Sequence, residues 1–538
     1  MIKRFLAFIL LLNSAASIGQ NLTQSELPIV VINTSQSQEI PDEPKILATM
    51  GIIDGGEGVI NQITDPFTEY NGNIGIETRG NSTQDFFKKT YSIELWDENL
   101  EDQSVNLFGM GGEEDWILHA MVIDKTQLRI PMSFYLWERM GNYAIERKYV
   151  ELVLNGEYRG LYAFMERLKR DDDRIDIAKL DEDDLAGDSL TGGYILRVDW
   201  IFDIEDENEY FLSEYDSQDG DPMTYQYYYP KAENILPPQR AYIKEFMDDF
   251  EDAVFSNDYF NSQNVRYSDY VDIETFVDFI LINEFSKNAD GYKLSSYLHK
   301  DRDDNDPRLK AGPIWDFDQT YGLSTVCSSH ITSGWTYLQN QEGCGDLESM
   351  PLWWQAMMQD TVFTNLMDCR WQQYRESFLH QDTIFAWIDE RVSFLENPIE
   401  RNFERWDFIG EEIWIEPENF PETYDGEIQY LKNWITARLN WLDNNIPGNC
   451  EFSTLSTDFN ENQIPLVIYP NPSSGIFQFD PLIEANATIR VFNSLGQMVE
   501  EIRGLSLTSI DLSSFPKGIY MLNIESQNMV RTEKVIIE

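Results

Sequence analysis

The stretch DIETFVDFILINEFSKNADGYKLSSYLHKDRDDNDPRLKAGPIWDFDQTYG spans residues 272–322 and carries most of the information about the fold. Its first part, residues 272–288, is apolar on almost every side, which predicts a buried helix. The following residues predict a loop that runs into a strand, and the polar run DRDDNDPR predicts the tip of a hairpin. Asp290 is therefore expected just past the buried helix, and Asp316 and Asp318 at the end of the hairpin's second strand.

This order of elements would bring Asp290, Asp316 and Asp318 together. Two carboxylates in the apolar run GPIWDFD need an explanation, because charged groups are costly to bury without a partner. One explanation is a metal site, since magnesium prefers hard oxygen ligands such as carboxylates. The other is that Asp316 and Asp318 face water on an alternating strand and that Asp290 is a turn residue before Gly291.

Upstream segments place candidate cations near a turn. GNIGIETRGNSTQDFFKKTYSIELW (72–96) predicts two strands joined by a polar turn, with Arg79 before the turn and Lys88 and Lys89 after it. A lysine entering a strand after such a turn is a candidate for contact with a phosphate. The alternative is that Lys88 and Lys89 are simply two solvent-exposed lysines, which would give the same sequence pattern.

Further elements make the first region a mixed domain. YVELVLNGEYRGLYAFMERL (149–168) predicts a hairpin around Asn155-Gly156, with Glu166 near its end. Helices are predicted within 124–141, where Pro131 favours a kink or a later start, and within 426–447. Mixed strand and helix patterns from about residue 27 to 447 indicate a large α+β domain.

Composition excludes one class of function and indicates export. The formal net charge of −54 excludes a general nucleic-acid binder, because the chain could not neutralise phosphates along a duplex. Residues 1–20 join a basic start to a short apolar run and small residues, which predicts a signal peptide. No later run is long enough for a transmembrane helix. We therefore expect a protein that is secreted or held at the outer cell surface, with no transmembrane segment in the mature chain.

The end of the chain has a different texture. Residues 448–465 predict a polar linker, and residues 466–538 predict short alternating strands separated by turns, which is typical of a small all-β, immunoglobulin-like sandwich. Export permits disulfides among the four cysteines, and Cys327 and Cys344 flank a polar loop that they could close. Spacing alone does not establish any pairing, and all four could be free.

Seven segments of the first region, in this order, resemble the CotH family of secreted, atypical protein kinases. They are IETRGNSTQDFFKKTYSIEL, DWILHAMVIDKTQLR, VELVLNGEYRGLYAFMERL, GGYILRVD, YYYPKAENI, FILINEFSKNADGY and GPIWDFDQTYG, and they cover about residues 27–447. The resemblance implies an atypical protein-kinase-like domain that transfers the γ-phosphate of ATP to hydroxyl groups of an unknown protein substrate, with Mg²⁺ or Mn²⁺ as cofactor.

The resemblance also implies roles for individual residues. Asp290 matches the catalytic-loop aspartate that orients the acceptor hydroxyl, and Asp316 and Asp318 match the metal-binding segment. The nucleotide would be contacted by Arg79, by Lys88 or Lys89, and by Glu166, which stands where a kinase-like hinge would meet it.

One departure keeps a second class of function open. Kinases of the common type carry an asparagine, a second metal ligand, five residues after the catalytic aspartate, and here that position is Ser295. The alternative is a catalytically inactive surface or binding module that keeps the kinase-like fold. A hydrolase of surface polymers would need paired acids at a glycosidase spacing, and no second site of that kind is visible.

The C-terminal strands carry a second resemblance. YPNP, SLGQ, GIY and the terminal KVIIE together resemble the C-terminal sorting domain of the type IX secretion system, over residues 466–538. That resemblance implies passage across the outer membrane by the type IX machinery.

Overall fold

The computed structural model divides the chain into two compact units, residues 1–450 and 451–538. It describes residues 21–450 apart from 81–83, 85, 202–203, 205, 218–219, 340–343, 345–349 and 414, and residues 467–537 apart from 470–472, 474, 484–486, 494–497, 505–506 and 527–528. The predicted signal peptide and nearly all of the predicted linker lie outside the described residues. None of the helices in the described part of the chain is long and apolar enough to cross a membrane.

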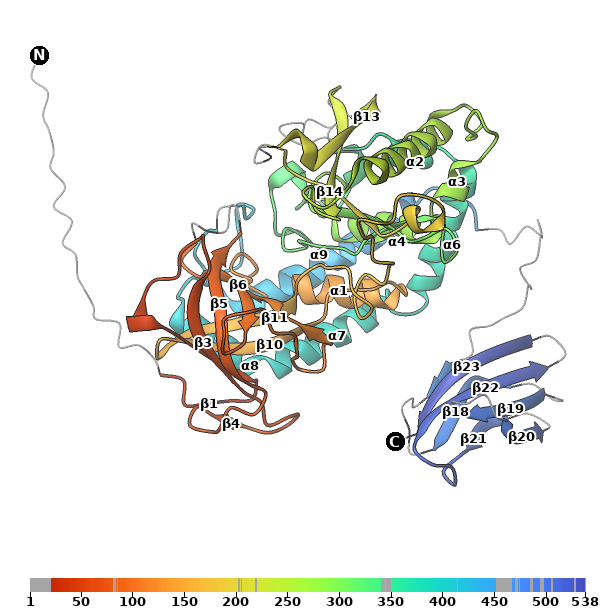
Figure 1. Ribbon diagram of the computed structural model, residues 1–538. Helices are drawn as coiled ribbons and strands as arrows, with labels where there is room; N and C mark the ends of the chain where they lie inside the picture. Colours follow the sequence, from red (N-terminus) through yellow and green to blue (C-terminus); the bar gives the residue numbers. More distant parts are fainter. Residues whose placement is uncertain are drawn as a thin grey trace, which may run out of the picture. The chain divides into compact units, whose positions relative to one another are not determined.

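The first unit begins with a closed, seven-stranded sheet, drawn in red to orange in Figure 1. The strand order is β10-β11-β9-β6-β5-β3-β2, and β10 pairs in parallel with β2 to close it. Its strands are β2 (Ile29–Thr34), β3 (Ile46–Ile53), β5 (Tyr70–Arg79), β6 (Thr90–Trp96), β9 (Asp115–His119), β10 (Arg147–Leu154) and β11 (Glu157–Glu166). The predicted strand pairs β5–β6 and β10–β11 are confirmed.

The β10–β11 hairpin turns at Asn155-Gly156, as the sequence predicts. Asn155 and Gly156 both have positive φ, 53° and 78°. A two-residue turn of this kind matches the right-handed twist of the flanking strands, and asparagine and glycine adopt it at least cost. The short pairs β1 (Gln24–Ser25) with β4 (Asn61–Gln62) and β7 (Val105–Asn106) with β8 (Gly112–Glu113) lie outside the closed sheet.

A second sheet and nine described helices complete the first unit. The sheet has the order β13-β14-β12-β15-β16, with β12 (Tyr194–Val198), β13 (Tyr210–Asp216), β14 (Pro222–Tyr229), β15 (Ser296–Lys300) and β16 (Leu309–Ala311). The helices are α1 (Arg129–Arg139), α2 (Pro237–Phe255), α3 (Tyr267–Tyr270), α4 (Ile273–Ser286), α5 (Trp353–Met357), α6 (Thr361–Arg375), α7 (Gln381–Phe394), α8 (Glu396–Arg405) and α9 (Tyr424–Asn445). Figure 1 shows the closed sheet at one end, the second sheet with α2 and α4 at the other, and α1 and α9 between them.

Helix α4 forms the centre of the larger core, as the apolar stretch predicts. Asp272 caps its start by accepting hydrogen bonds from Glu274 N and Thr275 N at 3.2 and 3.4 Å. All residues from Phe276 to Ser286 are buried. The helix ends where Lys287 turns into the left-handed region with φ 48°, so the chain leaves α4 with Asp290 three residues further on.

The second unit is β-rich, as predicted. It contains a three-stranded sheet of β17 (Val467–Tyr469), β18 (Ile476–Ile483) and β21 (Leu507–Asp511), and a four-stranded sheet of β19 (Ala487–Asn493), β20 (Met498–Gly504), β22 (Gly518–Ser526) and β23 (Met529–Ile537). Both sheets contribute to one apolar core, with Phe477 and Phe479 from the first and Ile489 and Leu522 from the second.

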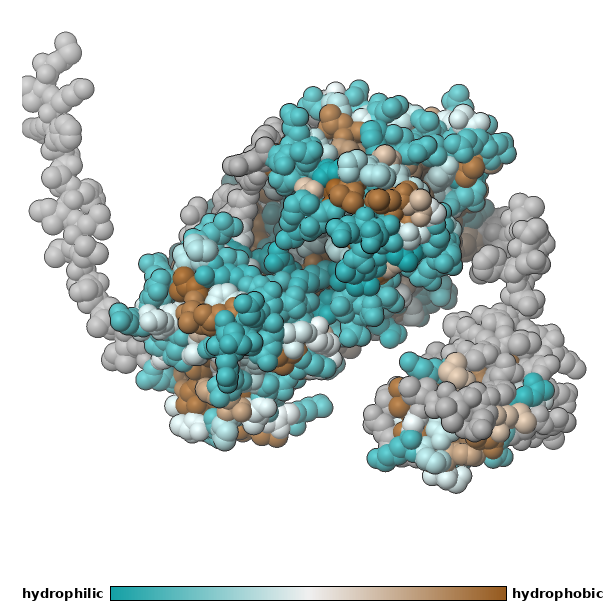
Figure 2. Space-filling model, in the orientation of Figure 1, coloured by the Kyte–Doolittle hydropathy of each residue, from teal (hydrophilic) through white to brown (hydrophobic). Residues whose placement is uncertain are grey.

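All four cysteines are paired, in the disulfide considered from the sequence and in a second one that the sequence analysis did not name. Cys327 pairs with Cys344 across 17 residues, and Cys369 pairs with Cys450 across 81 residues. The face of the molecule in Figure 2 is mostly hydrophilic over the described residues, as the high content of charged side chains requires.

Candidate active site

Asp290 lies in a tight turn directly after α4. Asn288 Oδ1 accepts a hydrogen bond from Asp290 N at 3.2 Å, and Asn288 O accepts one from Gly291 N at 3.1 Å. Asp290 Oδ2 in turn accepts a hydrogen bond from Gln319 Nε2 at 3.1 Å. Because Gln319 follows Asp318 in sequence, this contact joins the two predicted parts of the site.

Asp316 and Asp318 lie beyond the hairpin rather than at the end of its second strand, so that prediction is wrong. Strand β16 ends at Ala311, because Gly312 has a positive φ of 105° and Pro313 has no N–H to continue the ladder. The segment then turns back to α4, where Tyr321 N donates to Ser286 O at 2.8 Å and Ala289 N to Gln319 O at 3.4 Å.

The charges of these aspartates act on one another. Burial raises the pKa of Asp318 well above its usual range, and the negative charges of Asp316, Asp290 and Asp124 raise it further. Burial likewise raises the pKa of Asp316 to about 6, with a further contribution from Asp199 and opposing ones from Arg79 and the Ser295 hydroxyl. The charges of Asp290 and partly buried Asp316 thus both reach buried Asp318, and the three carboxylates form one acidic site.

Asp199 belongs to this site although the sequence analysis missed it. It follows β12 at the end of the segment GGYILRVD, and Arg197 Nη1 lies 3.5 Å from its Oδ2. After burial, the negative charge of Asp199 is the largest influence on the pKa of Asp316. The signal that could have found it is an aspartate directly after the apolar run of GGYILRVD, a segment quoted only for the family resemblance.

Arg79 reaches the same site from the closed sheet. It is the last residue of β5, and its guanidinium carbon lies 6.0 Å from the centre of the Trp315 ring. Its Nη1 atom is buried and has no hydrogen-bond partner among the described residues. Burial lowers its pKa and the charge of Asp316 opposes this effect, so Arg79 lies within electrostatic reach of Asp316.

Lys88 points into the closed sheet instead. Its ammonium group donates to Ala120 O at 2.8 Å, to Leu161 O at 2.5 Å and to Asn402 Oδ1 at 3.1 Å. An ammonium group has three protons, so these acceptors use all of its donors. Burial lowers its pKa to about 7. This geometry favours a structural role over contact with a phosphate.

Lys89 and Glu166 also have partners elsewhere. Lys89 Nζ donates to the Gln84 carbonyl. Glu166 Oε2 accepts from Tyr143 OH at 3.0 Å and from Glu146 N at 2.8 Å. Its Oε1 lies 3.0 Å from Arg174 Nε, and burial raises its pKa to about 7. These contacts therefore join the end of β11 to the segment before β10 and to Arg174.

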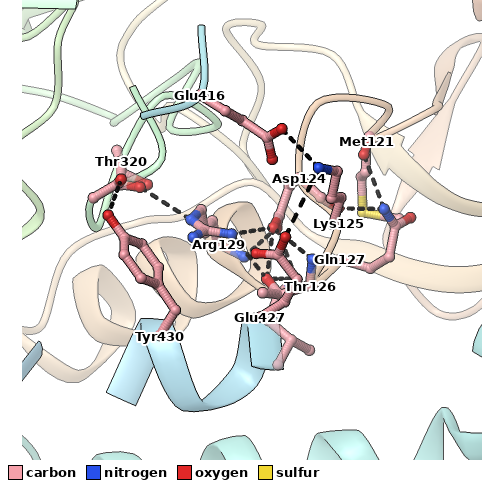
Figure 3. Close-up of polar contacts among 12 residues, drawn as sticks. Met121, Asp124, Lys125, Thr126, Gln127, Arg129, Thr320, Glu416, Glu427 and Tyr430 are labelled. Atoms are coloured by element: carbon pink, nitrogen blue, oxygen red, sulfur yellow. Dashed lines mark hydrogen bonds and ion pairs between the residues drawn. The ribbon is translucent and has the colours of Figure 1, made fainter. Parts of the chain in front are cut away.

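A buried polar network at the start of α1 contacts the backbone that follows Asp318. Figure 3 shows this network. Asp124 accepts hydrogen bonds from Leu128 N and Arg129 N at its Oδ2, at 2.9 and 2.8 Å. Its Oδ1 accepts from Thr126 N at 2.9 Å and from Arg129 Nη1 at 2.5 Å. Arg129 Nε then donates to Thr320 O at 3.0 Å, two residues after Asp318. The DKTQLR segment thus fixes the backbone that carries the aspartates.

The donor set fits a hard divalent cation. Asp290, Asp316 and Asp318 offer oxygen ligands whose mutual repulsion a cation would relieve. Among the described residues, only Glu113, Glu114 and Asp115 form a trio with ligand atoms within 4.8 Å of one another, and Lys169 Nζ already reaches all three at 2.8, 2.9 and 2.7 Å. Asp290, Asp316 and Asp318 are not such a trio, so an ion held by Asp316 and Asp318 would complete its shell with waters or phosphate oxygens, as magnesium commonly does.

Comparison with known protein families gives a match over most of the first unit. The sequence model of the CotH kinase protein family matches residues 76–442, which include Asp290, Asp316 and Asp318. The chain belongs to the CotH family. The match begins inside β5, so it leaves out β2 and β3, although these strands close the CotH protein's first sheet.

The second unit has a match of its own. The secretion system C-terminal sorting domain matches residues 467–538, and this implies export by the type IX secretion machinery, to the cell surface or into the medium. The search of curated proteins found no match for this CotH protein.

Proposed function

We propose that this CotH protein is a metal-dependent phosphotransferase that moves the γ-phosphate of ATP to hydroxyl groups of a protein substrate. The observation that carries the proposal is that the charges of Asp290 and Asp316 both act on buried Asp318, with burial raising the pKa of Asp316 and of Asp318. Such groups destabilise a fold unless a ligand offsets their repulsion, and they cluster at functional sites. A kinase-like arrangement of the first unit is part of this proposal.

In the proposed reaction, two aspartates bind the metal ion and the third accepts a proton. Mg²⁺ or Mn²⁺, held by Asp316 and Asp318, would neutralise phosphate charge as the γ-phosphoryl group moves. Asp290, oriented by Gln319 at 3.1 Å, receives the proton of the acceptor hydroxyl. The new bond joins the acceptor oxygen to the γ-phosphorus, and the bond from that phosphorus to the bridging oxygen breaks and releases ADP.

Ser295 has a role that the sequence comparison did not suggest. Its hydroxyl forms a hydrogen bond with Asp316 and lowers the pKa of that carboxyl. A hydroxyl that donates to a metal-ligating carboxylate orients that ligand without coordinating a second ion. The proposal therefore needs only the one ion held by Asp316 and Asp318.

The test is transfer of labelled γ-phosphate by the purified full-length protein with Mg²⁺ or Mn²⁺. We expect label on the protein itself or on an added protein substrate, and its loss to background in Asp290→Asn and in Asp318→Asn. Asp172→Asn is the matched control, because its side chain is 86% exposed. Transfer that persists in both site variants would overturn the proposal.

The alternative, an inactive binding module, is favoured by one observation. The predicted phosphate lysine, Lys88, uses its donors inside the protein. A wild-type protein that shows no transfer and no shift in thermal unfolding with Mn²⁺ and ATP would support this alternative.

Metal binding should restore the stability that the protein without metal loses as the pH rises towards neutral. The Asp316 pKa is about 6 in the folded protein against about 3.9 in an unfolded chain, so the folded state binds more protons between these values. Its contribution to stability is therefore complete below about pH 4 and is lost as the pH rises through 6. Without metal, the free energy of unfolding of wild type should fall by about 2–3 kcal/mol relative to Asp316→Asn between about pH 4 and 7.5.

Mn²⁺ should restore this loss near neutral pH and have little effect at about pH 4, where protons compete for the carboxylates. Tryptophan fluorescence during denaturant unfolding measures both effects. A metal effect of equal size in Asp318→Asn would show that the ion binds elsewhere on this acidic chain.

A further inference from the structure

A glutamine links the segment of Asp316 and Asp318 to the turn that carries Asp290. Gln319 O accepts a hydrogen bond from Ala289 N at 3.4 Å, and Gln319 Nε2 donates to Asp290 Oδ2 at 3.1 Å. A glutamine amide has a donor end and an acceptor end of nearly the same shape. Turned the other way, it would place its oxygen against the Asp290 carboxylate, and the two acceptors would repel. The contact with Asp290 therefore depends on what fixes the orientation of this amide.

The side chain that fixes it is Ser324. This serine is fully buried, and its hydroxyl donates to Gln319 Oε1 at 3.0 Å. The same hydroxyl oxygen accepts a hydrogen bond from Val326 N at 3.1 Å. A backbone N–H group only donates and an ionised carboxylate only accepts, so Val326 and Asp290 set one direction for the whole chain of hydrogen bonds. Hydrogen bonds that run in one direction also strengthen one another.

The loop that carries Ser324 is held in place from the segment between α8 and α9. Thr325 N and Thr325 Oγ1 both donate to Ile415 O, at 2.8 and 3.0 Å. The next residue, Glu416, accepts a hydrogen bond from the fully buried Lys125 at 2.6 Å, and Figure 3 shows this contact. The Ser324 hydroxyl is thus presented to Gln319 from an anchored backbone.

We propose that Ser324 is a positioning residue of the phosphoryl transfer, which holds the Gln319 amide so that Asp290 keeps the orientation in which it accepts the proton of the acceptor hydroxyl. The inference rests on the proposed function, because it concerns the proton-accepting aspartate. A misplaced proton acceptor slows the chemical step. Because the hydroxyl acts through Gln319 and not on the metal-binding carboxylates, its loss should leave the binding of metal and of ATP unchanged.

The experiment measures kcat and KM for transfer of labelled γ-phosphate by the full-length protein with Mn²⁺, and the affinity for Mn²⁺ alone by titration calorimetry. Ser324→Ala should lower kcat by about tenfold and Gln319→Leu by about 10- to 100-fold, with KM for ATP and Mn²⁺ affinity as in wild type. The double variant should be no slower than Gln319→Leu, because the hydroxyl acts through the amide.

The matched control is Ser329→Ala, the same substitution in the same loop. The Ser329 hydroxyl is also buried, but it has no hydrogen-bond partner among the described residues. This control should keep the wild-type kcat. An equal loss of kcat in Ser324→Ala and Ser329→Ala would overturn the proposal, because it would show a general effect of the loop.

Unfolding in denaturant without metal tests the chain of hydrogen bonds independently of activity. Ser324→Ala should unfold at a lower denaturant concentration than Ser329→Ala, and this difference should shrink when both changes are made in the Gln319→Leu background. A difference that Gln319→Leu leaves unchanged would show that the two side chains are not coupled, and it would overturn the proposal.

The remaining outcomes separate this proposal from the proposed function. Wild-type kcat in Ser324→Ala, or losses that add in the double variant, would remove the role of Ser324 and leave the transfer reaction in place. A higher KM or a weaker Mn²⁺ affinity in Ser324→Ala would also overturn it, because Ser324 would then support binding. If the wild-type protein transfers no phosphate, the proposed function fails, and the role of Ser324 fails with it.

Discussion

Replacing Asp124 with asparagine is expected to lower the free energy of unfolding of the first unit by about 3–5 kcal/mol. The substitution keeps the shape of the side chain but not its chemistry. Both carboxylate oxygens accept hydrogen bonds, Oδ1 from Thr126 and from Arg129 Nη1, Oδ2 from Leu128 N and Arg129 N. An asparagine side chain has only one acceptor oxygen, so its NH₂ group would point at one of these two sets of N–H and O–H donors, which would lose their acceptor. Arg129, fully buried, would also lose its negatively charged partner.

Denaturant unfolding followed by tryptophan fluorescence isolates this effect, because all 14 tryptophans lie before residue 450. The matched control is Asp97→Asn, since Asp97 is partly exposed while its Oδ1 also accepts two backbone N–H bonds. The control should unfold as wild type does. Asp124→Asn should also weaken Mn²⁺ binding, because Arg129 holds the Thr320 carbonyl next to the acidic segment. Equal stability of the two variants would show that the buried pair contributes little.

Much of the fold could be predicted because its signals are local. The Asn155-Gly156 turn, the apolar α4 and the caps at helix ends depend on residues a few positions apart. The closure of the first sheet could not be predicted in this way. It depends on parallel pairing of β10 with β2, where Glu151 lies opposite Ile29, and no local pattern marks such a distant partner.

The candidate site shows the same limit at the level of side chains. Asp290 and Asp318 could be predicted because one segment carries both, and its hairpin returns the chain to the end of α4. The direction of Lys88 could not, because one of its acceptors is Asn402, 314 residues away on α8.

Removing the Cys369–Cys450 disulfide by a double change to serine is expected to cost about 4–5 kcal/mol, the entropy that closure of an 81-residue loop removes from the unfolded chain. The bond ties the end of the first unit to α6, where Cys450 N also donates to Asp368 Oδ2 at 2.8 Å. The natural control is Cys327→Ser with Cys344→Ser, since the same relation predicts about 3 kcal/mol for a separation of 17 residues.

The two pairs of changes should differ in a second readout. Lys293, three residues after Asp290, lies 3.5 Å from Cys327 Sγ, and Lys287 Nζ holds the same loop through the carbonyls of Ser328, Ile331 and Ser333. Loss of Cys327–Cys344 should therefore lower Mn²⁺ affinity although it costs less stability, whereas loss of Cys369–Cys450 should leave that affinity unchanged. Equal stability losses would contradict the loop-entropy argument, and equal metal affinities would show that the smaller loop does not support the turn that carries Asp290.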